Sequence, residues 1–178
     1  MFGTKTSGNI TFYYDSEGLF NDVSLMSAYM TKNLGSENGS LMDEYNISDD
    51  EKDVYKACVM QTLPNIYETM LKIASGVPDA FDAEVKVEAK EDSGLKREAG
   101  TYIELSIKDN SAYNSNVKSL VDATILNCLK YGILSEFYSI CVNMELYKIA
   151  HDTFTVCLFQ LKQRLFQLKK KVISSQLS

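Results

Sequence analysis

The sequence predicts an α-dominated α+β fold with about four helices, a small antiparallel β-ribbon and an extended N-terminal arm. Apolar residues recur at helical spacing over residues 21–34, 48–75, 116–139 and 143–172. Two shorter runs within residues 82–108 alternate apolar and polar side chains, as half-buried strands do. The length of 178 residues suits a single domain with a core of its own.

Residues 1–20 are expected to form the arm. Residues 9–14 are rich in side chains that favour strands, and they stand apart from the other predicted elements. A short strand without a local partner must pair elsewhere to be stable. We therefore expect Ile10, Phe12 and Tyr14 to pair with a neighbouring subunit.

The first two helices are predicted over residues 21–34 and 48–75. Asn21 or Asp22 would cap the first helix, whose predicted inward face is Leu25, Met26, Tyr29, Met30 and Leu34. The second opens with a capping box at Ser48 and Glu51, and Pro64 should bend or split it. Its predicted inward face is Val54, Tyr55, Cys58, Val59, Thr62, Ile66, Met70 and Ile73.

The ribbon is predicted from two runs that alternate with a period of two. Their apolar members are Ala83, Val85, Val87 and Ala89, and then Ile103, Leu105 and Ile107. Because two strands alone are marginally stable, we expect the ribbon to pack on helices or to be extended by strands of other subunits.

The last two helices are predicted over residues 116–139 and 143–172, with a break near 140–143. The predicted inward residues of the first are Val117, Leu120, Val121, Thr124, Ile125, Cys128, Leu129, Ile133 and Phe137. Those of the second are Tyr147, Ala150, Phe154, Cys157, Leu158, Leu161, Leu165 and Leu168. One continuous helix here would be unusually long for a globular domain, which is why we place a break.

Composition excludes several classes of function. The net charge of −6 disfavours general binding of nucleic acid by the body, and no apolar run is long enough to span a membrane. The N-terminus is not a signal peptide, so synthesis in the cytoplasm is expected. The four cysteines, Cys58, Cys128, Cys141 and Cys157, lack the close pairs of a zinc site and are expected to be reduced and buried.

No motif of a known catalytic or nucleotide-binding site occurs. His151 and Asp152 are neighbours on a helix and therefore do not face each other. The acids Asp49, Asp50 and Glu51 are explained by their place in the first helical turn, where they favour the helix dipole. We expect no catalytic residue, no cofactor and no metal.

The basic C-terminal tip is the main functional candidate. From residue 162 onward the chain has five cations and no acid: Lys162, Arg164, Lys169, Lys170 and Lys171. The remaining 13 cations and 24 acids give the body a charge of −11. Three interpretations stay open for the tip: complementation of the helix dipole, docking on an acidic protein surface, and contact with DNA phosphates.

The order of elements resembles that of head–tail connector proteins, the adaptor or ring proteins in the necks of crAss-like and related phages of gut bacteria. The resemblance rests on the opening helix Asn21–Tyr29, the acid-capped helix from Ser48, the strand Tyr102–Ile107, the long helix Val117–Tyr138 and the basic ending. It covers residues 21–172. The chain departs from the pattern at Phe137, where a tryptophan is frequent, and in lacking an Arg/Pro-rich tail.

The resemblance implies a single connector-like domain over residues 21–172 with a β-hairpin at 82–108, followed by a tail at 173–178. It also implies a ring of identical subunits, typically twelve, that binds the portal protein and other neck or tail proteins in the virion. Packaged DNA would pass through the lumen without sequence-specific binding, and no membrane is involved. The cations of the tip would dock on acidic protein or face DNA.

Three other functions are compatible with parts of the same sequence. A small interaction or regulatory protein made by a phage or bacterium would be monomeric or dimeric. A nucleic-acid-binding module using the basic tip would bind DNA with a steep salt dependence. An enzyme would need a cluster of catalytic side chains around His151.

Overall fold

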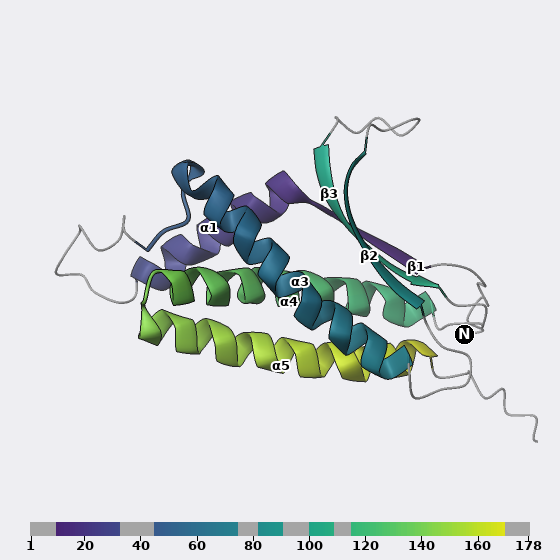
Figure 1. Cartoon of the computed structure of the whole chain (residues 1–178). Coiled ribbons are helices and arrows are strands. Elements are labelled where there is room, and N and C mark those ends of the chain that lie inside the picture. The colour runs from purple at the N-terminus through teal and green to yellow at the C-terminus, as the bar shows by residue number, and fades with distance from the viewer. Residues whose placement is uncertain (1–9, 33–44, 75–81, 91–99, 109–114, 170–178) are drawn as a thin grey trace, which may run out of the picture.

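Helices dominate the computed structural model, which describes residues 10–32, 45–74, 82–90, 100–108 and 115–169 (Figure 1). Along the chain the elements are β1 (Ile10–Asp15), α1 (Ser16–Lys32), a short 3₁₀ turn η1 (Asp49–Glu51), α3 (Lys52–Ala74), β2 (Asp82–Lys90), β3 (Gly100–Lys108), α4 (Ser115–Ile140) and α5 (Met144–Lys169). The prediction of a helix-dominated chain with four helices is therefore confirmed for the described residues. The predicted tail and Leu34 lie outside them.

The core is built on an antiparallel pair, α4 and α5, with α3 crossing the pair (Figure 1). The inward stripe of α5 is buried along its length, from Leu146 to Leu168. In α4 the predicted inward residues are buried except Leu120, which is exposed. Gly132 lies where the three helices meet, since a Cβ atom there would overlap the Thr62 methyl group and stand 3.0 Å from Phe154 Cε2.

The helix α3 runs unbroken past Pro64. Proline removes the amide that would bond to the carbonyl of Met60, and both residues lie on the exposed side of α3. Water can replace that amide on the exposed side, so the helix is not split there. Its buried residues include Tyr55, Cys58 and Ile66, as the sequence pattern predicts.

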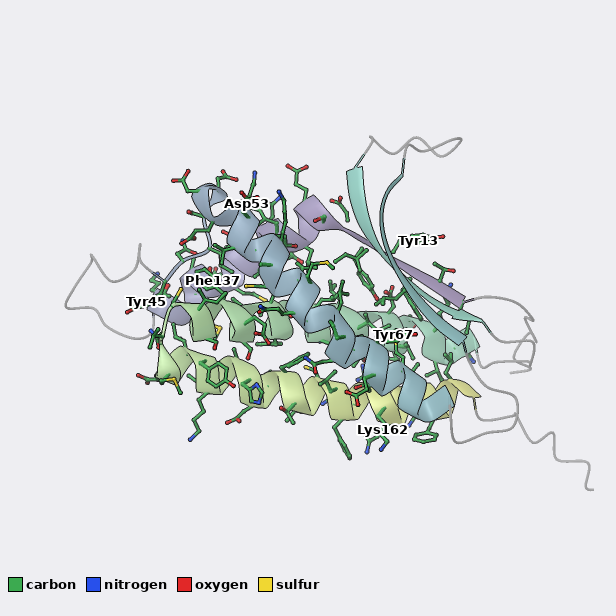
Figure 2. All side chains as sticks on the ribbon, in the orientation of Figure 1. Tyr13, Tyr45, Asp53, Tyr67, Phe137 and Lys162 are labelled. Atoms are coloured by element: carbon green, nitrogen blue, oxygen red, sulfur yellow. The ribbon has the colours of Figure 1, made fainter. Side chains whose placement is uncertain are left out.

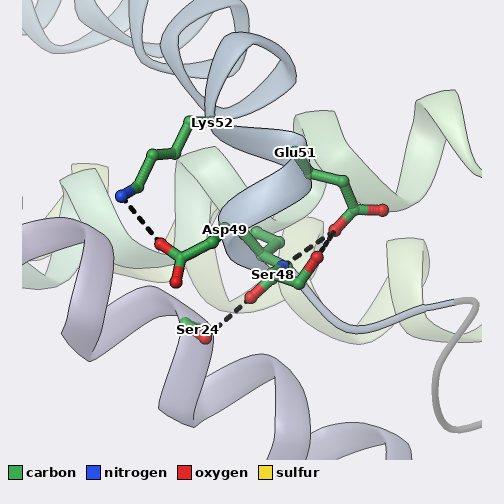
Figure 3. Close-up of polar contacts among 6 residues, drawn as sticks. Ser24, Ser48, Asp49, Glu51 and Lys52 are labelled. Carbon is green, nitrogen blue, oxygen red and sulfur yellow. Dashed lines mark hydrogen bonds and ion pairs between the residues drawn. The ribbon is translucent and has the colours of Figure 1, made fainter.

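The capping box at the start of this helix is present (Figure 3). The Glu51 carboxylate accepts a hydrogen bond from the Ser48 amide at 2.8 Å. Lys52 forms an ion pair with Asp49 at 2.7 Å, and the Ser24 hydroxyl donates to the Ile47 carbonyl at 2.7 Å. The last bond ties α1 to the segment that leads into α3.

The structure corrects the predicted N-terminal arm over residues 10–20, whereas residues 1–9 of the arm lie outside the described residues. Residues 10–15 form β1, which pairs antiparallel with β3 of the same chain in the register Ile10–Ile107 to Asp15–Tyr102. β2 pairs with the other side of β3, which gives the order β1-β3-β2. The prediction of a neighbouring subunit as the partner is therefore wrong for this edge of β1. The true partner, β3, lies about ninety residues further along the chain, and no local sequence pattern indicates a pairing over that separation.

The inward face predicted for the first helix is wrong in part, because only Met26 and Met30 of its described members pack against the core. The helix begins at Ser16, five residues earlier than predicted, and Asp15 rather than Asn21 or Asp22 bonds its first turn, through the Gly18 amide at 2.8 Å. Its buried residues are Leu19, Phe20, Val23, Ser27 and Thr31. Leu25 and Tyr29 consequently face outward.

The described helices include none that is long and apolar enough to cross a lipid bilayer.

Candidate interaction surfaces

No catalytic cluster forms among the described residues. They bring no three potential metal ligands together. A cavity of about 230 Å³ lies between β1, α1 and α3, lined by residues that include Ser16, Phe20, Lys52 and Tyr55. Two of its polar side chains already have partners, because the Tyr55 hydroxyl donates to the Ser16 carbonyl at 3.2 Å and Lys52 pairs with Asp49. Its volume is below the usual range for a small-molecule site.

The His151 ring contacts a serine on α4 and a tyrosine on α5. Its Nδ1 atom is 3.4 Å from the hydroxyl of buried Ser135, and its ring stacks on Tyr147 with centroids 5.2 Å apart. Ser135 is buried, so a substrate in solution does not reach its hydroxyl. This pair joins α4 to α5 and gives no support for the catalytic interpretation.

The predicted strand residues Ile10, Phe12 and Tyr14 are buried in this chain. The Tyr14 hydroxyl donates to the Asp122 carboxylate on α4 at 2.7 Å. Burial and this hydrogen bond raise the pKa of Tyr14 above its usual range. Tyr14 thus ties β1 to α4, and the three buried side chains are not available to a neighbouring subunit.

The cations of the basic tip have different surroundings. Lys162 is exposed and points away from the bundle (Figure 2). Arg164 instead reaches from α5 to α4, where its guanidinium donates to the Leu120 carbonyl at 3.0 Å and to the Thr124 hydroxyl. Lys169 is the last residue of α5, and Lys170 and Lys171 lie outside the described residues.

Arg164 also faces Cys128 and Cys157, two of the cysteines that were expected to be buried. The Cys128 thiol donates a hydrogen bond to the Cys157 sulfur, and this bond, aided by the charge of Arg164, lowers the pKa of Cys157 to about 7. The same bond and burial raise the pKa of Cys128. Cys128, Cys157 and Arg164 therefore form one polar contact between α4 and α5.

Apart from Tyr13, Met60 and Leu120, the exposed large apolar side chains of the described residues lie on three parts of the surface. The first is the α1 face, which consists of Leu25 and Tyr29 and is 59% and 64% exposed. The second is the α5 seam, whose apolar members Ile149, Val156, Phe159 and Phe166 are between 49% and 60% exposed. The third is the hairpin tip, the turn between α4 and α5.

The hairpin tip carries Ile140, Val142 and Met144, which are 52%, 76% and 66% exposed. The Asn143 amide bonds to the Tyr138 carbonyl at 3.0 Å, and the Val142 amide to the Ser139 carbonyl at 3.2 Å. This is a Schellman ending, which places Val142 in the left-handed region at φ 56°. Glycine is the usual residue there, and valine costs about 1–2 kcal/mol.

The sequence analysis missed all three surfaces. The prediction places the α1 face in the core and assigns to α5 only its buried stripe, although further large apolar residues follow the opposite side of that helix. The turn itself agrees with the predicted break near residues 140–143. Its left-handed residue has no signal in composition, because no glycine marks the position.

Comparison with known proteins gives no match to a family model, a curated protein or a solved structure.

Proposed function

We propose that the chain is a structural subunit of a homo-oligomeric ring in the neck of a phage, where it joins the portal to the tail and surrounds the DNA channel. The observation that carries this proposal is the exposure of three separate apolar surfaces on a small domain whose described residues form no catalytic cluster. Exposed apolar surfaces of this kind mark contacts with other proteins.

A ring subunit needs two different faces, one for each neighbour. The α1 face and the α5 seam meet this requirement, because α1 and α5 pack on different sides of α4 (Figure 1). Head-to-tail contact between unlike faces closes into a ring when the rotation permits. The resemblance in element order supplies the expected copy number of twelve.

The hairpin tip is the proposed contact with the portal. Valine at a left-handed position lowers the stability of the chain, whereas glycine would relieve the strain. An exposed valine at this strained position is explained if the Val142 side chain is buried when the hairpin tip binds another protein. The tip lies at one end of the molecule, away from the sheet (Figure 1).

The charge distribution fits a channel through which DNA slides. The strongly acidic body would neutralise few phosphates and therefore bind DNA weakly. Lys162, which is free of the bundle, is assigned to an acidic protein neighbour in the virion rather than to sequence-specific binding of DNA. The chain would be made in the host cytoplasm and incorporated on assembly.

The test is the mass of the purified chain, alone and after mixing with a portal particle from the same genome. We expect a stoichiometric complex with the portal. Val142→Gly should weaken that complex while keeping the fold, and Gln61→Ala, on the exposed side of α3, should leave it unchanged. A chain that ignores the portal in every form would refute the neck assignment.

A second candidate function, a small dimeric interaction or regulatory protein, is favoured by one observation: four large apolar side chains, Ile149, Val156, Phe159 and Phe166, are exposed along one side of α5. If the chain dimerises but does not bind the portal, this candidate replaces the first.

A further inference from the structure

The outer side of α5 carries a regular seam that nothing in the described chain covers. Its six positions are spaced by three and four residues in turn, and all are exposed: Ile149, Asp152, Val156, Phe159, Gln163 and Phe166. This is the spacing of the contact positions in a coiled coil. The seam extends for about 26 Å along the helix. The opposite side of α5 is already buried against α4 and α3.

The pattern of the seam is the same in both directions along the helix. From either end it reads apolar, polar, apolar, apolar, polar, apolar, and the spacing of its positions is symmetric as well. A surface with this symmetry is complementary to a second copy of itself turned through 180°. Contact of like patches about a twofold axis is the commonest arrangement of homodimers.

We propose that the α5 seam docks the α5 seam of a second copy of this chain in antiparallel orientation. In this arrangement Ile149 of one copy lies opposite Phe166 of the other, and Val156 opposite Phe159. Each β-branched side chain thus meets an aromatic ring, which fills the space between the helices more evenly than two rings or two small side chains would.

The polar positions select the antiparallel orientation. Asp152 lies opposite Gln163, whose amide can donate to the carboxylate, and the exposed Lys162 of the other copy is adjacent. A parallel pair would instead place Asp152 against its own copy, with like charges facing. Antiparallel helices also bring opposite ends of their dipoles together.

The occupant is a second α5 rather than an α1 helix because the α1 face offers only two strongly exposed large apolar residues, Leu25 and Tyr29. That face can pair with only part of the seam. The twofold pair contains two copies and cannot grow into a ring. It would hold the free chain as a dimer and cover a face that head-to-tail assembly needs.

The proposed dimer does not depend on the neck assignment. Only the consequence that the dimer would keep free chains from assembling into a ring rests on the proposed function. The two ideas can be separated by experiment. Portal binding is tested with Val142→Gly at the hairpin tip, outside the seam, and dimerisation is tested on the free full-length chain.

The first experiment measures the mass of the free chain over roughly a hundredfold range of concentration, because dimerisation follows mass action. We expect a monomer–dimer equilibrium that the double variant Val156→Glu with Phe159→Glu shifts to monomer at all concentrations. The matched control is Gln61→Glu with Asn65→Glu, which adds the same charge on the exposed side of α3 and should leave the dimer intact. A monomeric wild-type chain, or a dimer that persists in the seam variant, would overturn the proposal.

The second experiment needs no disruption of the apolar positions. Asp152→Lys should weaken the dimer by facing Gln163 and Lys162 of the other copy, and adding Gln163→Glu should restore it by re-forming an opposite-charge pair. Loss without restoration would contradict the pairing of these two positions.

The third experiment determines the orientation. A photo-reactive phenylalanine analogue at Phe166 should cross-link to the segment around Ile149 of the other copy. Cross-links to the C-terminal half of α5 would indicate a parallel pair and would also overturn the proposal.

Discussion

At the scale of single residues, Val142 is the clearest departure from a stable local structure. The turn between α4 and α5 satisfies its backbone amides through the Schellman bonds, and Asn143 caps α5 by accepting the Leu146 amide at 3.1 Å. Only the side chain at the left-handed position conflicts with this geometry. The strain is therefore local and can be removed without disturbing either helix.

We predict that Val142→Gly raises the free energy of unfolding by about 0.5–1 kcal/mol, because relief of the left-handed strain exceeds the extra entropy of glycine in the unfolded chain. Denaturation in urea would measure it. Val142→Ala is the control, since alanine keeps the strain while losing most of the side chain, and it should not stabilise. A less stable glycine variant would show that the valine side chain contributes packing.

The contact between Cys128 and Cys157 gives a second prediction at this scale. Cys128→Ala removes the hydrogen bond that is the main cause of the low pKa of Cys157, so this pKa should rise from about 7 towards the usual thiol value. Thiolate absorbance at 240 nm as a function of pH would measure the change. Cys128→Ser keeps a donor and should keep the pKa of Cys157 low.

The sign of the effect on stability follows from the same pKa. Because the folded-state pKa of Cys157 lies below the unfolded value, its thiolate contributes stability above the ordinary thiol pKa of about 8.5. That contribution should be lost as the pH falls through about 7. In Cys128→Ala this dependence should flatten, and a profile identical to that of the wild type would contradict the assignment.

At the scale of elements, the junction of α3, α4 and α5 depends on close approach at Gly132. Glycine within a helix is ordinarily unfavourable, so alanine there would gain up to about 1 kcal/mol from helix propensity alone. The geometry reverses this, because the added Cβ would overlap the Thr62 methyl group and press on Phe154.

We therefore predict that Gly132→Ala lowers the stability by about 1–3 kcal/mol, as overpacking does in a filled core. Thermal or chemical unfolding would measure the loss. Combining it with Thr62→Ser, which removes the overlapping methyl group, should recover much of the stability. Additive losses in the double variant would mean that the two residues do not compete for the same space.

Elements also show how far the sequence determines the fold. The inward faces of α3, α4 and α5 were largely predictable, because each helix is long enough for its stripe to repeat several times. For α1 the prediction placed the start too late and omitted Leu19 and Phe20, so the apolar face was rotated towards Leu25 and Tyr29. Its true inward side includes buried Ser27, whose hydroxyl donates to Asn46 at 2.6 Å, and no helical pattern reports such a tertiary partner.

The candidate surfaces were less predictable than the elements. The basic tip was visible in the charges, but only the packing of α5 on α4 shows that Arg164 bonds inside the chain while Lys162 is exposed. Likewise, the seam on α5 is apolar in sequence, but a helix with two apolar stripes does not reveal which one is buried. Burial of the stripe around Leu161 and Leu165 identifies the other as surface.

At the scale of the whole molecule, the apolar surfaces make different predictions about assembly. The seam serves a twofold pair in the free chain, whereas a ring on the portal also needs the α1 face. Changing the α1 face should therefore separate the two states. Leu25 and Tyr29 are mainly exposed, so their replacement should change stability by no more than about 0.5 kcal/mol.

We predict that Leu25→Ser with Tyr29→Ser leaves the free dimer intact but prevents a complete ring on the portal particle, because each subunit would lack one of its two neighbour contacts. Sedimentation of the free chain and particle mass on the portal would measure the two states separately. Replacement of Gln61 and Asn65 by serine is the control for general surface effects. Complete rings from the α1 variant would show that the α1 face is not a ring contact, and loss of the free dimer would place the twofold contact on α1 instead of α5.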